Sequence, residues 1–221
     1  MNHTQSDDTT PIPQANEDGS INFVLPKGAE DLVIVKTEDA PVVERPQPMF
    51  TDEQLPSFVL GESDVRIPLT HLVMLQSAAI ALLAQSQREV LIVSSDLEHE
   101  RYDNDHFVEA LSAFARSSRH TVTRILLADP TLAVVDGHRL IKLMRKLSSL
   151  VEIKQLHEDD IKHIESVIIA DDIGLLRCTS RDPWQGTLLP KGTPYAQQAR
   201  ERFMDWWQRA DEVVDFREFR I

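Results

Sequence analysis

The residues best suited to chemistry lie around one short apolar run in the second half of the chain. His163 and Glu165 are two positions apart where a polar loop enters the run 166–169, and Asp171 follows that run. Side chains two apart on a strand project from the same face, so the His163 imidazole and the Glu165 carboxylate are expected side by side. Histidine and carboxylate groups serve in nucleophilic catalysis. This stretch is therefore the candidate catalytic motif.

A second set of polar residues gathers at or near the C-terminal ends of the predicted strands, where open α/β sheets form their binding crevice. The set comprises Asp96, Tyr102, Asp129, His138, Arg139 and His157. In a binding interpretation Arg139 contacts an anion and Asp96 orients the ligand through a polar contact. Helix capping and loop pinning are the alternative roles for the same residues.

Metal and cofactor sites are not expected. The segment 157–160 and His163 supply oxygen and nitrogen atoms, but their spacing matches no metal-ligand pattern, and a solvated turn is the simpler interpretation. Glycine is scarce, with seven residues in 221, and no Gly-rich loop is present to cradle a phosphate. The sequence therefore predicts no metal, no cofactor and no nucleotide or dinucleotide site.

Apolar periodicity predicts alternating strands and helices from residue 58 onward. Strands are expected at 58–60, 65–67, 89–93, 121–127, 151–156, 166–169 and 173–178, with helices at 70–84, 104–119, 134–147 and 194–209. Thr70 and Asn104 suit helix N-caps, and 97–102 and 181–193 are expected as loops. The order predicts an α/β domain with a mainly parallel sheet, helices on both faces and a terminal antiparallel hairpin.

The first 57 residues differ in composition from the domain expected at 58–221. Seven of the twelve prolines lie within the first 60 residues, and the formal charge is −10 up to Asp64 against −3 for the remaining 157 residues. Such a segment buries too little apolar surface to offset its ordering entropy, so it is expected to be largely disordered. Two apolar patches, 21–25 and 31–35, are candidates for edge strands or for contact with a protein partner.

The overall charge of −13 lowers the expectation of nucleic-acid binding, although a local basic groove is compatible with it. A single cysteine, Cys178, excludes an intrachain disulfide and predicts a buried thiol in a reducing cytoplasm. Residues 1–8 lack the pattern of a signal peptide. The longest apolar run, 72–84, is broken by Gln76 and Ser77, so no membrane span is expected.

The stretch that begins at His163 resembles the motif of the phospholipase D-like superfamily, His-x-Lys followed by four residues and Asp. Glu165 stands at the lysine position and Ala170 at the aspartate position, with Asp171 one residue late. The element order over about 58–210 is similar to one half-domain of that superfamily. Within it, 83–156 resembles an uncharacterised bacterial family of such domains, some of which follow an acetyltransferase domain. That resemblance is carried by Asp96-Leu97, Tyr102-Asp103-Asn104, Gly137-His138-Arg139-Leu140 and Leu156-His157.

The resemblance implies phosphodiester chemistry with His163 as nucleophile, a second histidine as general acid and lysines on the phosphate oxygens. It also implies two half-sites, so a chain with one half would need a homodimer. Glu165 would place a carboxylate beside the phosphate, and Ala170 cannot orient the imidazole, although Asp171 would do so after a one-residue bulge.

Three hypotheses follow. The first is a non-catalytic, cytoplasmic binding or interaction module, a homodimer, whose acidic tail contacts a partner. The second is a divergent phosphodiesterase or phosphoryl-transfer enzyme that uses His163 and Asp171. The third, a regulatory domain that partners an acetyltransferase, rests on the fusion seen in the resembling family alone.

Overall fold

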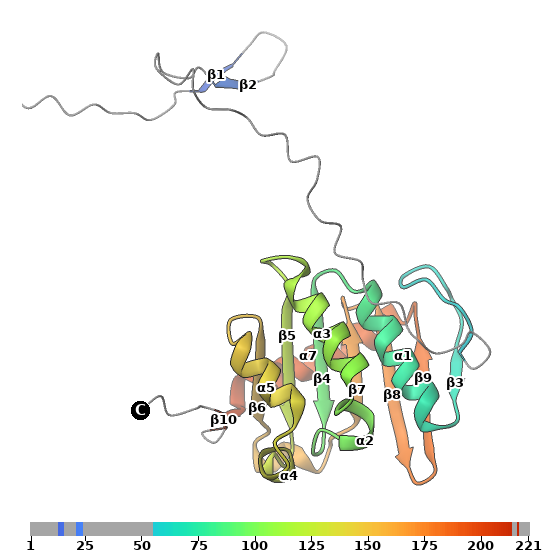
Figure 1. Cartoon of the computed structure of the whole chain (residues 1–221). Coiled ribbons are helices and arrows are strands. Elements are labelled where there is room, and N and C mark those ends of the chain that lie inside the picture. The colour runs from blue at the N-terminus through green and yellow to red at the C-terminus, as the bar shows by residue number, and fades with distance from the viewer. Residues whose placement is uncertain (1–12, 16–20, 24–54, 214–215, 217–221) are drawn as a thin grey trace, which may run out of the picture. The chain divides into compact units, whose positions relative to one another are not determined.

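The structure is a computed structural model that describes residues 13–15, 21–23, 55–213 and 216, in two compact units, 1–42 and 43–221 (Figure 1). In the first unit, β1 (Pro13–Ala15) pairs antiparallel with β2 (Ile21–Phe23). The patch predicted at 21–25 therefore forms a strand over its first three residues. The patch at 31–35 and most of the segment predicted to be disordered lie outside the described residues.

The second unit is built on one open sheet of eight strands in the order β10-β6-β5-β4-β7-β8-β9-β3. The strands are β3 (Ile67–Leu69), β4 (Glu89–Ser94), β5 (Val122–Leu127), β6 (Val151–Gln155), β7 (Ser166–Ala170), β8 (Gly174–Arg181), β9 (Trp184–Leu189) and β10 (Asp211–Glu212).

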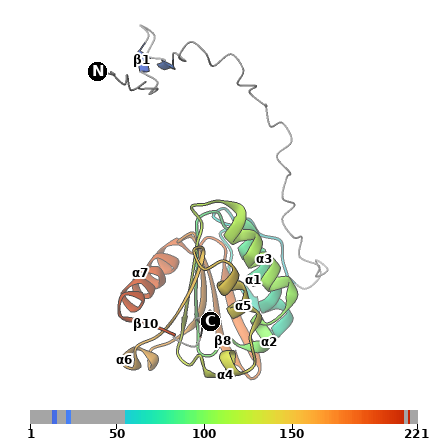
Figure 2. The ribbon, with the colours of Figure 1, turned by 60° about the vertical axis from the view of Figure 1, so that its left-hand side comes forward.

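Helices cover both faces of this sheet, which confirms the predicted α/β class with its terminal hairpin. On one face lie α1 (Leu72–Gln85), α3 (Asp105–Ser117) and α5 (Arg139–Lys146), and on the other lies α7 (Thr193–Arg209) (Figure 2). The described residues also form three single-turn helices, α2 (His99–Tyr102), α4 (Thr131–Val135) and α6 (Glu158–Ile161). Among the described helices, none has the length and apolar character needed to cross a bilayer.

The sheet is mixed rather than mainly parallel. Parallel pairing joins only β4, β5 and β6, whereas β7, β8, β9, β3 and β10 pair antiparallel with their neighbours. A parallel pair needs a crossover of about a dozen residues, usually a full helix. The short connection through α6 instead passes the ends of β5 and β4 at the edge of the sheet where β6 ends, so β7 starts at that edge and runs antiparallel to β4.

Local signals explain most of the elements, with four corrections. Residues 58–60 form no strand, and the strand predicted at 65–67 is β3 at Ile67–Leu69. Asn104 caps α3 as predicted, since its side chain accepts a 2.9 Å hydrogen bond from the Phe107 N–H. The N-cap of α1 is His71 rather than Thr70. The helix predicted at 134–147 is interrupted by Gly137, whose φ of 65° ends α4 before α5 begins. The segments predicted as loops at 97–102 and 181–193 contain α2 and β9.

The core has two parts because the central strands alternate their side chains between the faces. On β4, Val90 and Ile92 pack beneath α1 and α3, whereas Leu91 and Val93 pack with Trp206 of α7. Burying one such side chain contributes about 1.5–3 kcal/mol. The centre of the sheet is therefore sealed on both faces.

Among the described residues, the β8-β9-β3 end of the sheet is covered on one face only. Its inner side chains, such as Leu176 and Leu188, are buried with α1. Helix α7 covers the opposite face of β4 and β7 and reaches only the start of β8, at Leu175. Beyond it, Pro68 and Gln185 are exposed. This end of the sheet therefore offers an open face.

Candidate functional site

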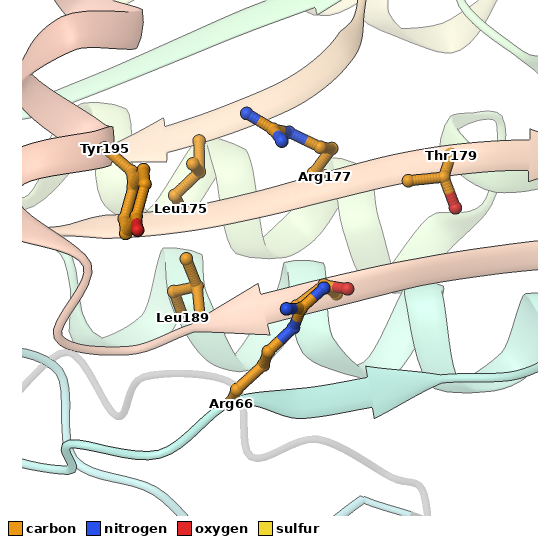
Figure 3. A pocket seen from close by; sticks show the side chains of 7 residues that line it. Arg66, Leu175, Arg177, Thr179, Leu189 and Tyr195 are labelled. Carbon is orange, nitrogen blue, oxygen red and sulfur yellow. The ribbon is translucent and has the colours of Figure 1, made fainter.

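The open face carries a depression of about 300 Å³ where β8, β9 and the residue before β3 meet the first turn of α7. Its lining consists of Arg66, Leu175, Arg177, Thr179, Thr187, Leu189 and Tyr195 (Figure 3). A smaller hollow next to it shares Arg177 and Tyr195 and adds, among others, Glu165, Arg202 and Trp206. The two hollows are called the groove below.

Strand register places the groove side chains on one face. Arg177 on β8 lies opposite Thr187 on β9, and Leu175 lies opposite Leu189 two residues further along. Cross-strand partners share a face at about 5 Å separation of their Cβ atoms. Figure 3 shows Leu175 and Leu189 beside Tyr195, while the Arg66 side chain extends toward β9. An apolar end and a cationic end are thus adjacent.

The groove is electropositive. Its only described carboxylate, Glu165, lies 3.2 Å from the Arg177 Nε, but this contact lacks hydrogen-bond geometry. Both side chains are half exposed. Among the described residues, neither Arg66 nor Arg202 has an ion-pair partner; Arg202 lies 5.9 Å from the Trp206 ring. Three guanidinium groups against one carboxylate favour an anion.

The structure does not bring His163 and Asp171 together. His163 is exposed in the turn after α6, where its N–H donates to the Asp160 carbonyl at 3.0 Å, and Glu165 immediately precedes β7. Asp171 follows the other end of β7, roughly 20 Å from Glu165 at about 3.3 Å per residue. The pairing of β7 with β4 and β8 runs in continuous register, so the bulge that would have moved Asp171 is not formed.

Asp171 instead ties the turn between α1 and β4 to the end of β7. Its carboxylate accepts hydrogen bonds from the N–H groups of Gln87 at 2.7 Å, Arg88 at 2.7 Å and Glu89 at 2.9 Å. Ala170 is fully buried in the core. Both residues near the aspartate position of the motif thus have roles in holding the sheet.

Asp96 lies in an ion network on the loop after β4. Arg181 donates to both of its carboxylate oxygens, at 2.9 and 3.0 Å, and to Glu98 at 2.9 Å. Although partial burial opposes it, the hydrogen bonds with Asp96 and the charge of Glu98 raise the pKa of Arg181. This geometry matches the loop-pinning alternative for Asp96.

His138 and Arg139 connect the start of α5 to the segment around α2. The His138 Nδ1 accepts from the Leu140 N–H, and its Nε2 lies 3.1 Å from the Leu97 carbonyl, so the imidazole is neutral with the proton on Nε2. Burial lowers the pKa of His138. The Arg139 guanidinium pairs with Asp105 at 3.3 Å and donates to the Asp103 carbonyl.

Tyr102 is fully buried beside the equally buried Arg101, whose guanidinium lies 4.8 Å from the centre of the Tyr102 ring. Burial raises the pKa of Tyr102 far above its ordinary range. The Arg101 Nη1 donates to the Ser166 hydroxyl at 3.0 Å. Tyr102 is therefore a core residue without access to a ligand.

Asp129 and His157 lie at strand ends, as predicted, and cap local turns. The Asp129 carboxylate accepts from the Thr131 N–H at 2.9 Å, and hydrogen bonding to Thr131 lowers the pKa of Asp129. His157 is the N-cap of α6 and accepts from the Asp159 N–H at 3.4 Å. Within the described part of the chain, no group of histidine, cysteine and acidic side chains could hold a metal ion.

Of the predicted site residues, only Glu165 lies in the groove. The others lining it were missed because β9 was assigned to a loop, and because Arg66, Arg177 and Tyr195 were placed in strands and a helix without a role in a site. The sequence does contain a signal for this strand. Asp182-Pro183 is a turn pair, and the residues after it alternate between two faces, with Gly186 and Leu188 on one face and Thr187 and Leu189 on the other. Recognising a strand there would have placed Thr187 beside Arg177.

A family model matches most of the chain. The model of a family described as a domain of unknown function (DUF7931) matches residues 71–219. No curated protein matches the chain.

Several solved structures are similar in fold. TrmBL2, an archaeal chromatin protein with a novel mode of DNA binding, matches at a TM-score of 0.52 and 14% identity over 69% of this chain and 55% of TrmBL2. This chain thus spans about half the length of TrmBL2. Nuc from Salmonella typhimurium, a phospholipase D family member, has a TM-score of 0.47 and 14% identity over 67% of this chain and 99% of Nuc. Phosphatidylserine synthase from Haemophilus influenzae has a TM-score of 0.49 and 10% identity over 68% and 39% of the two chains.

Proposed function

This chain belongs to the family described as a domain of unknown function (DUF7931), and we propose that it is a non-catalytic, phospholipase D-like binding module. The observation that carries the proposal is the position of Glu165. It replaces the lysine of the superfamily motif and lies in the groove, 3.2 Å from Arg177. A carboxylate at this position lacks the cation that would hold the phosphate oxygens, and because it is half exposed it opposes phosphodiester binding by roughly 0.2–1 kcal/mol.

The surroundings of His163 support the same conclusion. A nucleophilic histidine needs a partner that orients its ring. Asp171, the sequence candidate for that partner, accepts three backbone hydrogen bonds at the far end of β7. A divergent phosphodiesterase built on these two residues has no support in this geometry.

The groove supplies the binding function of the proposal. It combines arginine side chains with an apolar wall and an exposed tyrosine ring, which is the mixture found in small-molecule sites. It lies on the one face of the sheet that α7 leaves open. A ligand can therefore reach it without rearrangement of the core.

Hydrolysis of bis(p-nitrophenyl) phosphate tests the absence of catalysis. The full chain is assayed beside His163→Ala and beside Lys162→Ala, an exposed neighbour that serves as the matched control. All three proteins are expected to release nitrophenol at the rate of buffer alone. Turnover that is lost in His163→Ala and kept in Lys162→Ala would overturn the proposal.

The oligomeric state is measured on the same samples by light scattering. A single half-domain needs a second copy to complete a phosphodiesterase site, so catalysis by a strict monomer would point to a contaminant. A binding module works as a monomer or as a dimer, and we propose the homodimer as the form to test first.

A further inference from the structure

Resting on the proposed binding function, we propose that the groove takes a small phosphate monoester whose phosphate is attached to a planar or apolar body. The phosphate would lie between Arg66 and Arg177, and the body would lie against Tyr195. The charge of the groove, its hydrogen-bond donors, its apolar wall and its size each favour such a ligand.

The groove contains positive charge that no described residue fully neutralises. Arg66 is exposed and has no hydrogen-bond or ion-pair partner among the described residues. The Arg177 Nε is buried beside Glu165 without hydrogen-bond geometry, and no interaction within the described residues occupies its Nη groups, so these groups are available to an acceptor. Guanidinium groups bind phosphate through paired N–H donors. Two of them on either side of β9 favour a dianion over a single carboxylate.

The Thr187 hydroxyl group adds a hydrogen-bond donor between the two arginines. Thr187 lies directly opposite Arg177 on β9 and next to Pro68 of β3, on the same face of the sheet. Its hydroxyl has no partner within the described structure, whereas the Thr179 hydroxyl donates to the Gln185 carbonyl. Arg66, Arg177 and Thr187 together offer donors for the three terminal oxygens of a phosphate monoester.

The other end of the groove is apolar. The Tyr195 side chain is 60% exposed, which is unusual for a large ring beside Leu175 and Leu189. Exposed aromatic rings next to cationic groups favour flat ligands, which stack on the ring face. Figure 3 shows the ring beside the two leucines, at the end of the depression away from Thr179.

The size of the groove limits the size of its ligand. A volume of about 300 Å³ is at the small end of the range for ligand pockets. It accommodates a phosphate with one ring rather than a polymer. The chain charge of −13 and the Glu165 carboxylate also oppose a long polyanion. The favoured ligand is therefore a compact monoester rather than a nucleic acid.

Calorimetric titration of the full chain with three probes tests the proposal. Phenyl phosphate carries both parts of the ligand, inorganic phosphate only the anion, and phenol only the ring. We expect phenyl phosphate to bind at least about tenfold more tightly than either of the other probes, because the groove contacts both parts. Equal affinities for phenyl phosphate and inorganic phosphate, or no binding by about 10 mM phenyl phosphate, would overturn it.

Variants locate the site. Arg66→Gln and Arg177→Gln are each expected to weaken phenyl phosphate about tenfold or more, while Arg119→Gln, an exposed arginine outside the groove, has no effect. Tyr195→Ala should weaken phenyl phosphate and leave inorganic phosphate unchanged. Circular dichroism confirms that each variant is folded. Binding that survives both arginine substitutions would place the site elsewhere and overturn the proposal.

The same titrations separate this inference from the proposed function. Release of inorganic phosphate from phenyl phosphate by the wild type would overturn the non-catalytic function, whether or not the groove binds the ester. Binding elsewhere without turnover would leave the non-catalytic module intact and remove only the assignment of its ligand to the groove.

Discussion

Arg177 on β8 and Glu165 before β7 stand 3.2 Å apart across two neighbouring strands, at the point where the two hollows of the groove meet. The contact holds a cation of the groove against a carboxylate. Glu165 therefore competes with any anion for Arg177. The strength of the ion pair between Glu165 and Arg177 therefore affects how tightly the groove binds an anionic ligand.

Removing this competition should strengthen anion binding. Glu165→Gln is expected to lower the Kd for phenyl phosphate up to about fivefold, since a half-exposed ion pair contributes roughly 0.2–1 kcal/mol. Glu152→Gln, an exposed glutamate on β6, is the matched control and should leave the Kd unchanged. Calorimetric titration measures both. A weaker complex in Glu165→Gln would mean that the carboxylate assists binding.

The Asp171 carboxylate should be among the most sensitive polar groups for stability. Asp171→Ala removes the acceptor of three N–H groups and also places alanine at a φ of 53°, so a loss of about 3–5 kcal/mol in the free energy of unfolding is expected. Asp171→Asn should cost less because one acceptor oxygen remains. Urea unfolding gives the values.

The adjacent Asp172 provides the control for that experiment. Its φ of 55° is similar, but its carboxylate is more exposed and lies 3.6 Å from Arg88. Asp172→Asn is expected to change the free energy of unfolding by less than about 1 kcal/mol. Equal effects at the two positions would contradict the role given to Asp171.

His138 should make the protein sensitive to mild acid. Burial holds its pKa below the ordinary value of about 6.5, against the opposing charge of Asp103. Below that value the unfolded chain binds a proton at this histidine and the folded chain does not. The contribution of neutral His138 to the free energy of unfolding is therefore complete above about pH 6.5 and is lost as the pH falls toward the folded pKa. Thermal unfolding between pH 8 and pH 5 measures the slope.

A substitution isolates the histidine. His138→Gln keeps a donor for the Leu97 carbonyl without a titrating ring, so the unfolding temperature should fall less steeply below about pH 6.5. His120→Gln, at an exposed histidine, should retain the steep fall. The same slope in all three proteins would assign the acid sensitivity to other groups.

Gly186 should be intolerant of a side chain. A Cβ there would lie 2.5 Å from the Arg177 carbonyl oxygen and 2.7 Å from the Leu75 Cδ2, so the strand or α1 must move. Gly186→Ala is expected to cost about 1–3 kcal/mol in the free energy of unfolding. It should also weaken phenyl phosphate, because β9 carries Thr187. Gln185→Ala, an exposed neighbour, is the control in urea unfolding and should be nearly neutral.

The elements that could be predicted from the sequence are those with strong local signals. The buried strand β4 is a continuous apolar run, and α3 has both a cap at Asn104 and helical spacing of its apolar residues. The direction of β7 was not readable, because it depends on the short connection through α6. Strand β9 was missed because one of its faces is open and carries Thr187 and Gln185 rather than apolar residues.

The groove escaped prediction for a related reason. Arg66, Arg177 and Tyr195 come from three distant parts of the chain, and only the antiparallel pairing of β8, β9 and β3 brings them to one face. Likewise the sequence identified Asp171 as a notable carboxylate. Its partners at 87–89 are more than 80 residues away, and only the pairing of β7 with β4 places them within reach.

The pairing of β3 with β9 also bears on how the domain should be delimited. The family match begins at residue 71, after β3 has ended, yet β3 closes the sheet against β9 and follows directly on Arg66. A fragment trimmed to residue 71 would leave β9 as a bare outer strand, whose unpaired backbone groups invite aggregation with other copies. It would also lack half of the cationic end of the groove, so a negative binding result from such a fragment would report on the trimming and not on the protein.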